Sequence, residues 1–287
     1  NAGNSGTLAR LIMGLLVHSK SPVKIIGDKS LSKRDFLRIT EPLEKFGAKF
    51  KTNYGKLPIL IHGTKYPKPI KYLEKKGSAQ CKSAVMLAAL NTPGQTVIKA
   101  KKSRNHSELI FKYLKLNTKI YKDRAYDIIK INGKNKIKSF NYKIPSDISS
   151  SAFFIVLTAL IPRSKLQIKN VNINPSRSGI IKILKIMGVK ITLKNIKIYK
   201  GEKISDIRVK GPRTSKMKDV RDSQLPIHYR CRSILTRIQA RKHGCVIVIL
   251  ICVATGRIAI SCCGHRLFNR FATAWWHKIS PNFKPPY

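Results

Sequence analysis

A repeat of about 71 residues constrains the fold of this chain more than any other feature. Three segments begin with small polar residues and continue into an apolar run of helix length: NSGTLARLIMGLL at 4–16, GSAQCKSAVMLAAL at 77–90 and ISSSAFFIVLTAL at 148–160. The serines Ser5, Ser78 and Ser150 stand 73 and 72 residues apart. A repeat of this length indicates supersecondary units that stack to bury a shared core.

A second set of segments alternates with the first. Each contains an arginine-bearing loop, an amphipathic run, a turn residue and a short apolar strand, at residues 33–50, 103–120 and 174–191. The turn residues, 70 and 71 residues apart, are Gly47, Asn117 and Gly188. Because Gly and Asn tolerate the left-handed backbone that ends many helices, we expect a helix to end just before each of them.

Each unit is therefore expected to contain a helix, a strand, an arginine loop, a second helix and a second strand. β-rich segments such as PVKIIG and KLPILIHG lie between these elements. The first helix of each unit is apolar nearly all round, which predicts that strands surround it. The expected fold class is α/β (α+β), with repeated units packed around buried helices.

The composition of the chain changes near residue 220. Lysine predominates over arginine before this position, whereas residues 221–287 are rich in arginine and hold five of the six cysteines. A fourth unit is expected to begin near residue 222, yet IHYRCRSILTRIQARKHG at 227–244 is too basic for a buried helix. We interpret residues 220–287 as an anomalous tail that arises from a shifted reading frame, with a divergent natural extension as the alternative.

The net charge of +45, from 58 basic and 13 acidic residues, raises nucleic acid, an anionic membrane surface and anionic substrates as partners. Nucleic acid is not expected, because no helix-turn-helix, zinc-finger or RNA-recognition signature is present. No apolar run reaches the roughly 20 residues that span a bilayer, so no membrane segment and a cytoplasmic location are expected. The tail cysteines, with Cys262 and Cys263 adjacent, lack the spacing of metal ligands, so no metal is expected.

Polar helix starts and arginine loops together indicate anion chemistry. Free amides at a helix N-terminus favour negative charge, and a planar guanidinium holds a carboxylate or phosphate through two hydrogen bonds. Each arginine loop keeps an arginine in a lysine-rich part of the chain: Arg34, Arg104 and Arg177. Simple N-caps and solvated surface loops are the alternatives. We expect His106 to cap a loop rather than act as an acid or base, and Cys81 to pack rather than act as a nucleophile.

Six motifs stand in a characteristic order: NAGNSGTLAR, GDKSLSKRDFLRI, GSAQCKSAVMLAAL, SRNHSELIF, PSDISSSAFF and NPSRSGIIKILKIMGVKI. Over about residues 1–212 this order resembles the 5-enolpyruvylshikimate-3-phosphate (EPSP) synthase family. The resemblance implies an enolpyruvyl transferase-like inside-out barrel of repeated βαβαββ units, incomplete here, with an opening segment missing before Asn1. It implies two of three units of a first domain at 1–144 and the first unit of a second domain at 145–219.

The resemblance also implies the reaction. The family transfers the enolpyruvyl group of phosphoenolpyruvate to the 5-hydroxyl of shikimate 3-phosphate and releases phosphate, as a monomer without metal or organic cofactor. By matching position, the phosphoenolpyruvate-binding residues would be Gly6, Arg34 and Gln80. The residues on the shikimate-3-phosphate side would be Ser78, Ala79, Gln80, Ser103 and Arg104.

Two departures from the family pattern concern this chemistry. The family has Arg-Pro where this chain has Arg34 and Asp35, and an adjacent acid is expected to weaken the hold of Arg34 on an anion. The family's general acid/base aspartate, and a glutamate and a lysine downstream of it, have no counterpart; Asp222 alone stands near the aspartate position. The catalytic residues are therefore unknown, and the chain by itself is expected to have little or no activity.

Three alternative functions stay open. The first is the sister enolpyruvyl transferase that acts on UDP-N-acetylglucosamine, whose reactive cysteine would fall in the loop SLSK at 30–33, where this chain has none. The second is a pseudogene product without a selected function. The third is a basic nucleic-acid-binding protein.

Overall fold

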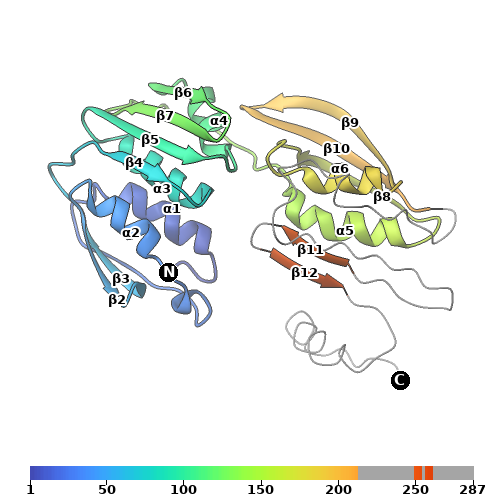
Figure 1. Cartoon of the computed structure of the whole chain (residues 1–287), viewed down its shortest axis with the longest axis horizontal. Coiled ribbons are helices and arrows are strands. Elements are labelled where there is room, and N and C mark those ends of the chain that lie inside the picture. Colours follow the sequence, from blue (N-terminus) through green and yellow to red (C-terminus); the bar gives the residue numbers. More distant parts are fainter. Residues whose placement is uncertain (213–248, 254–255, 261–287) are drawn as a thin grey trace. The chain divides into compact units, whose positions relative to one another are not determined.

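The computed structural model describes residues 1–212, 249–253 and 256–260 (Figure 1). The chain forms two compact units. The first comprises Asn1–Lys143 together with Ile198–Glu202, and the second comprises Ile144–Lys197 and the described residues from Lys203 onward. Within the described ranges, none of the helices has the length and apolar character needed to cross a membrane.

The first repeat of the first unit contains helix α1 (Gly6–Leu16), the short 3-10 helix η1 (Leu31–Lys33) and helix α2 (Leu37–Glu44). Its strands β1 (Val23–Ile25), β2 (Lys49–Asn53) and β3 (Lys56–His62) form an antiparallel sheet in the order β1-β3-β2. Alternate residues of β3 are buried, as expected for a strand with one face on the core: Leu57, Ile59 and Ile61.

The second repeat contains helices α3 (Ala79–Ala89) and α4 (His106–Tyr113). Its sheet has the order β4-β5-β7-β6, formed by β4 (Lys71–Glu74), β5 (Gln95–Lys101), β7 (Tyr126–Asn132) and β6 (Thr118–Lys122). β4 and β5 are parallel, whereas the other neighbours are antiparallel. Helix α3 packs against both α1 and β5. The backbones of α1 and α3 approach so closely that a Cβ on Gly14 would lie 2.2 Å from the carbonyl oxygen of Ala84.

The second unit contains helices α5 (Ile148–Leu160) and α6 (Gly179–Ile186). Its sheet has the order β8-β10-β9, formed by β8 (Lys165–Asn172), β10 (Glu202–Lys210) and β9 (Lys190–Tyr199). The adjoining ends of β9 and β10, within Ile198–Glu202, belong to the first unit. Strands β11 (Ile249–Val253) and β12 (Gly256–Ile260) form an antiparallel pair. The core includes residues of both helices and the sheet: Ile155, Val156, Val171, Leu184 and Ile207.

The repeat predicted the positions of six helices correctly. α1, α3 and α5 coincide with the three apolar segments, and α2, α4 and α6 follow the three arginine loops. Gly47 (φ +104°) and Gly188 (φ +88°) adopt the left-handed backbone, as predicted. The prediction is wrong for Asn117: α4 ends earlier, so Lys115 (φ +53°) makes this turn instead.

The predicted burial of the first helix in each unit is correct for α3 only. Nearly every residue of α3 is buried, because α1 covers one side of the helix and β5 lies on another. On α1, however, Leu8 is 50% exposed, and on α5 Phe154 and Leu157 are 60% and 54% exposed. The fold class is mixed α/β. The predicted tail at 220–287 lies outside the described residues, apart from β11 and β12.

Candidate functional site

Gly6 is the first residue of α1 and lies between two arginine side chains of the first unit. Ser5 begins the helix, and its hydroxyl accepts a hydrogen bond from the amide of Leu8 at 3.2 Å. A Cβ on Gly6 would lie 2.9 Å from Nη1 of Arg10 and 3.1 Å from Nη1 of Arg34. The missing side chain therefore leaves space in which two guanidinium groups approach a helix N-terminus.

Arg10 connects α1 to the start of α3. Its Nη1 donates to Oε1 of Gln80 at 3.1 Å, and Nε2 of Gln80 donates to the hydroxyl of Thr7 at 2.7 Å. The guanidinium lies 5.0 Å from the centre of the Phe36 ring. Burial, followed by the positive charge of Arg34, lowers the pKa of Arg10 below its ordinary value. A bound anion would relieve this unfavourable concentration of charge.

Arg34 is held by a chain of polar contacts rather than by an ion pair. Its Nη2 donates to Oδ1 of Asn4 at 3.4 Å, and Nδ2 of Asn4 donates to Oδ2 of Asp28 at 2.6 Å. Asp28 in turn accepts from the amide of Leu31 at 2.6 Å, which shapes the loop. Among the described residues, neither Arg34 nor Arg10 forms an ion pair with a carboxylate.

The carboxylate of Asp35 faces the start of α2. Its Oδ1 accepts a hydrogen bond from the amide of Leu37 at 2.9 Å, and its backbone carbonyl oxygen accepts from Nη2 of Arg10 at 3.4 Å. An acid at this point can also interact favourably with the helix dipole. Asp35 thus has a local structural role at the start of α2.

Ser78 and Ala79 begin α3. The hydroxyl of Ser78 accepts from the amide of Cys81 at 3.3 Å, and the amide of Ser78 donates to Glu74 at 2.9 Å. The hydroxyl hydrogen of Ser78 can still be donated to a ligand, because an N-cap uses only its acceptor. Cys81 is 4% exposed within α3, which confirms the prediction that it packs.

The loop of Ser103 and Arg104 is connected to α3 by a buried lysine. Nζ of Lys82 lies 2.5 Å from Oε1 of Glu108 on α4 and donates to the carbonyl oxygen of Arg104 at 2.9 Å. The hydroxyl of Ser103 is buried, with no hydrogen-bond partner in the described part of the chain. The ammonium group of Lys82 therefore joins α3 to the loop of Ser103 and Arg104.

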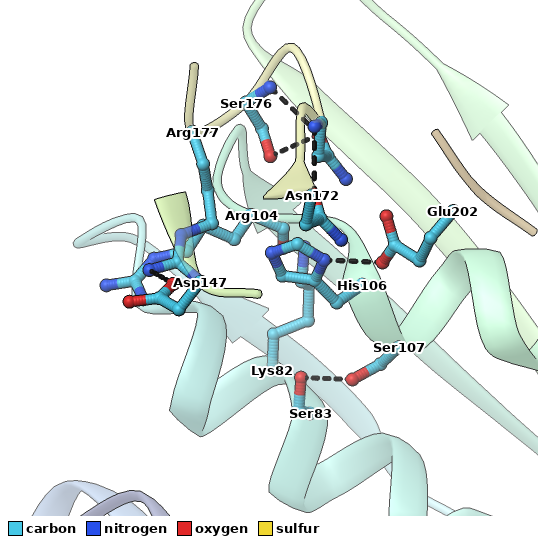
Figure 2. Close-up of polar contacts among 11 residues, drawn as sticks. Lys82, Ser83, Arg104, His106, Ser107, Asp147, Asn172, Ser176, Arg177 and Glu202 are labelled. Atoms are coloured by element: carbon cyan, nitrogen blue, oxygen red, sulfur yellow. Dashed lines mark hydrogen bonds and ion pairs between the residues drawn. The ribbon is translucent and has the colours of Figure 1, made fainter. Parts of the chain in front are cut away.

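His106 does not cap a loop, so that prediction is wrong. It is the first residue of α4, and its Nδ1 lies 2.5 Å from Oε1 of Glu202, which belongs to the same unit (Figure 2). The side chain of His106 is 32% exposed, whereas that of Glu202 is buried. This contact orients the ring toward Glu202, and Nε2 has no hydrogen-bond partner among the described residues.

Arg177 of the second unit has a carboxylate partner, unlike Arg34. Its Nη2 lies 2.7 Å from Oδ1 of Asp147 and donates to the hydroxyl of Ser149 at 2.6 Å. Oδ2 of Asp147 accepts from the amide of Ser150 at 3.0 Å and so begins α5. Partial burial raises the pKa of Asp147, but the Ser150 amide and the Arg177 charge outweigh burial and lower it overall.

The structure brings three of the predicted phosphoenolpyruvate residues together, since Arg10 contacts Gln80 and lies near Gly6 beside Arg34. Asp222 lies outside the described residues. The part of the chain that the structure describes holds no cluster of His, Cys, Asp or Glu suited to a metal ion.

The sequence interpretation missed two residues, Arg10 and Lys82. Arg10 follows Gly6 by four residues, which places both on one face of a helix, and this spacing was a readable signal. Lys82 is the single charged residue of α3, and a charge in a buried helix calls for a partner.

Solved structures define the class of protein. The EPSP synthase of Acinetobacter baumannii matches with a TM-score of 0.66 and 38% identity, over 77% of this chain and 50% of that chain. The enolpyruvyl transferase NikO from Streptomyces tendae matches with a TM-score of 0.53 and 12% identity, over 72% of this chain and 47% of that one, which shows the fold alone. The fold is that of the enolpyruvyl transferases.

Sequence comparisons define the family. The model of the family EPSP synthase (3-phosphoshikimate 1-carboxyvinyltransferase) matches residues 1–239. The 3-phosphoshikimate 1-carboxyvinyltransferases of Endomicrobium trichonymphae and Hydrogenovibrio crunogenus are each 41% identical, over 73% and 76% of this chain and 48% and 49% of theirs. The chain belongs to the EPSP synthase family, and it spans about half the length of the curated relatives it matches.

Proposed function

We propose that this chain carries the phosphoenolpyruvate-binding part of an EPSP synthase. The observation that supports this most strongly is the pair of guanidinium groups beside Gly6, which have no carboxylate partner among the described residues. Two adjacent positive charges are costly to hold together, so a site of this kind favours a ligand with more than one negative group. Phosphoenolpyruvate offers a carboxylate and a phosphate.

The residues take the following roles in the proposal. Arg34 and Arg10 hold the anionic groups of phosphoenolpyruvate beside Gly6, and Gln80 donates to either substrate. Shikimate 3-phosphate is bound by hydroxyl, amide and guanidinium groups that begin α3 and precede α4: Ser78, Ala79, Gln80, Ser103 and Arg104. Such donors accelerate the reaction where they hold the charge of the tetrahedral intermediate more strongly than that of the substrates.

The proposal extends to the whole reaction and its setting. The reaction is transfer of the enolpyruvyl group to the 5-hydroxyl of shikimate 3-phosphate, by a cytoplasmic monomer without cofactor. The fold is an inside-out barrel of βαβαββ units, with residues 1–144 and 145–219 in its two domains. We expect this chain alone to bind substrate but to turn over little or none of it, because the family's acid/base aspartate and its downstream glutamate and lysine have no counterpart in the sequence.

A titration tests the binding step. Phosphoenolpyruvate should shift the side-chain NMR signals of Arg10 and Arg34, and an excess of chloride at equal ionic strength should not. A titration that leaves the signals of both arginines unchanged would contradict the proposed function. Phosphate release by the purified chain, dependent on both substrates, would instead contradict the expected lack of turnover.

A further inference from the structure

The side chains of the ion pair between Lys82 and Glu108 are almost completely buried. The side chains are 1% and 6% exposed, and Nζ lies 2.5 Å from Oε1. Moving two charges out of water is expensive, and well-packed apolar residues often replace such a pair at no cost in stability. A buried pair of this kind therefore calls for a second role.

The second role is visible in the other contact of the ammonium group. Nζ of Lys82 donates to the backbone carbonyl oxygen of Arg104 at 2.9 Å. Lys82 lies just over one turn after Ser78 on α3, so one ammonium group joins the start of α3 to the loop before α4. These two segments carry all the residues that the proposed function assigns to shikimate 3-phosphate.

A neighbouring contact joins the same two helices without reaching this loop. The hydroxyl oxygens of Ser83 on α3 and Ser107 on α4 lie 2.6 Å apart (Figure 2). This pair supplies a natural comparison: it links α3 to α4 through side chains alone, whereas Lys82 also fixes the backbone of the loop.

We propose that Lys82 is a positioning residue for shikimate 3-phosphate: anchored by Glu108, its ammonium group holds the carbonyl of Arg104 and so sets the loop of Ser103 and Arg104 at the correct distance from Ser78. This inference rests on the proposed function. It gives Lys82 no contact with substrate. Because the ammonium group fixes only the loop of Ser103 and Arg104, its loss should weaken the binding of shikimate 3-phosphate and leave the binding of phosphoenolpyruvate unchanged.

The test uses the double variant Lys82→Met with Glu108→Gln, which removes both charges and leaves neither buried alone. Calorimetric titrations should show shikimate 3-phosphate binding about tenfold or more weaker, while phosphoenolpyruvate binding stays within about twofold. The control Ser83→Ala should leave both affinities within about twofold. If the double variant unfolds, Glu108→Asp, which withdraws the anchor by one methylene, should give the same selective loss. Equal loss of both ligands, or loss of neither, would overturn the proposal.

Amide hydrogen exchange in the absence of ligand separates this inference from the proposed function. The amides of residues 103–107 should exchange faster in the double variant than in Ser83→Ala. Unchanged exchange there would overturn the positioning role even if the wild-type chain binds shikimate 3-phosphate. If the wild-type chain does not bind this ligand, the proposed function fails, and faster loop exchange alone then supports the positioning of the loop by Lys82.

Discussion

Replacing Gly6 with alanine should weaken binding of phosphoenolpyruvate while leaving the fold intact. The new Cβ would lie 2.9 Å from Nη1 of Arg10, 3.1 Å from Nη1 of Arg34 and 3.4 Å from Cδ1 of Leu31. The nearest two atoms are the ends of flexible side chains, which can move aside. The guanidinium groups must then leave the positions in which they face a common ligand.

The magnitude follows from these contacts. A hydrogen bond to a charged group contributes about 1.5–3 kcal/mol, and each 1.4 kcal/mol corresponds to about a tenfold change in affinity. Loss of the equivalent of one such bond should therefore weaken phosphoenolpyruvate binding by about 10- to 150-fold. Stability should change by less than about 1 kcal/mol, because alanine favours the helix by about 0.5–1 kcal/mol over glycine and offsets the displaced side chains.

The same substitution about two turns further along α1 gives a matched control. In Gly14→Ala the Cβ would lie 2.2 Å from the backbone oxygen of Ala84, which cannot rotate aside. Overpacking of this kind costs about 1–3 kcal/mol, so the midpoint of thermal unfolding should fall by several degrees. Calorimetric titration and thermal unfolding of both variants separate the two effects. The reasoning is refuted if Gly6→Ala binds phosphoenolpyruvate as tightly as wild type, or if its stability falls as far as that of Gly14→Ala.

Three further substitutions test individual contacts. Arg34→Lys should weaken phosphoenolpyruvate binding about tenfold or more in a titration, because lysine cannot hold an anion through a planar fork. The control Arg38→Lys, at a half-exposed ion pair, should change this affinity little. Asp35→Asn should leave that affinity within about twofold, since the carboxylate of Asp35 faces the start of α2; a large gain in affinity would show that its charge does oppose Arg34. The pKa of Asp147 is lowered by folding, so this carboxylate should stabilise the protein above its ordinary pKa of 3.8 and lose that contribution as the pH falls below it. The free energies of unfolding of wild type and Asp147→Asn, measured with urea, should therefore differ at neutral pH by less than about 1 kcal/mol, because the group is partly exposed. The two free energies should converge in acid. A difference that persists at low pH would contradict the lowered pKa of Asp147.

The helices could be predicted from the sequence because the residue patterns that indicate them are local. A small polar start followed by an apolar run recurs at α1, α3 and α5, and each element depends on only a dozen neighbouring residues. Which faces become buried depends instead on what packs against them. α3 has α1 on one side and β5 on another, whereas Leu8 of α1 and Phe154 of α5 remain exposed. Three similar helices therefore differ in burial for a reason that no single segment contains.

The two residues that the sequence interpretation missed are both departures from the repeat. When the serines at the helix starts are aligned, Lys82 stands where the other repeats have Ala9 and Phe154, and Arg10 stands where they have Ser83 and Ile155. A repeat is maintained by packing, so a charge at a position that is uncharged in the other copies carries a cost in that copy alone and must be offset by a specific contact. Arg10 contacts Gln80, which lies 70 positions further along the chain, and Lys82 contacts Glu108 in another helix. These partners could therefore be identified only in three dimensions. The positions themselves, in contrast, stand out when the three copies are compared with one another, because a charge replaces an uncharged residue at each of them.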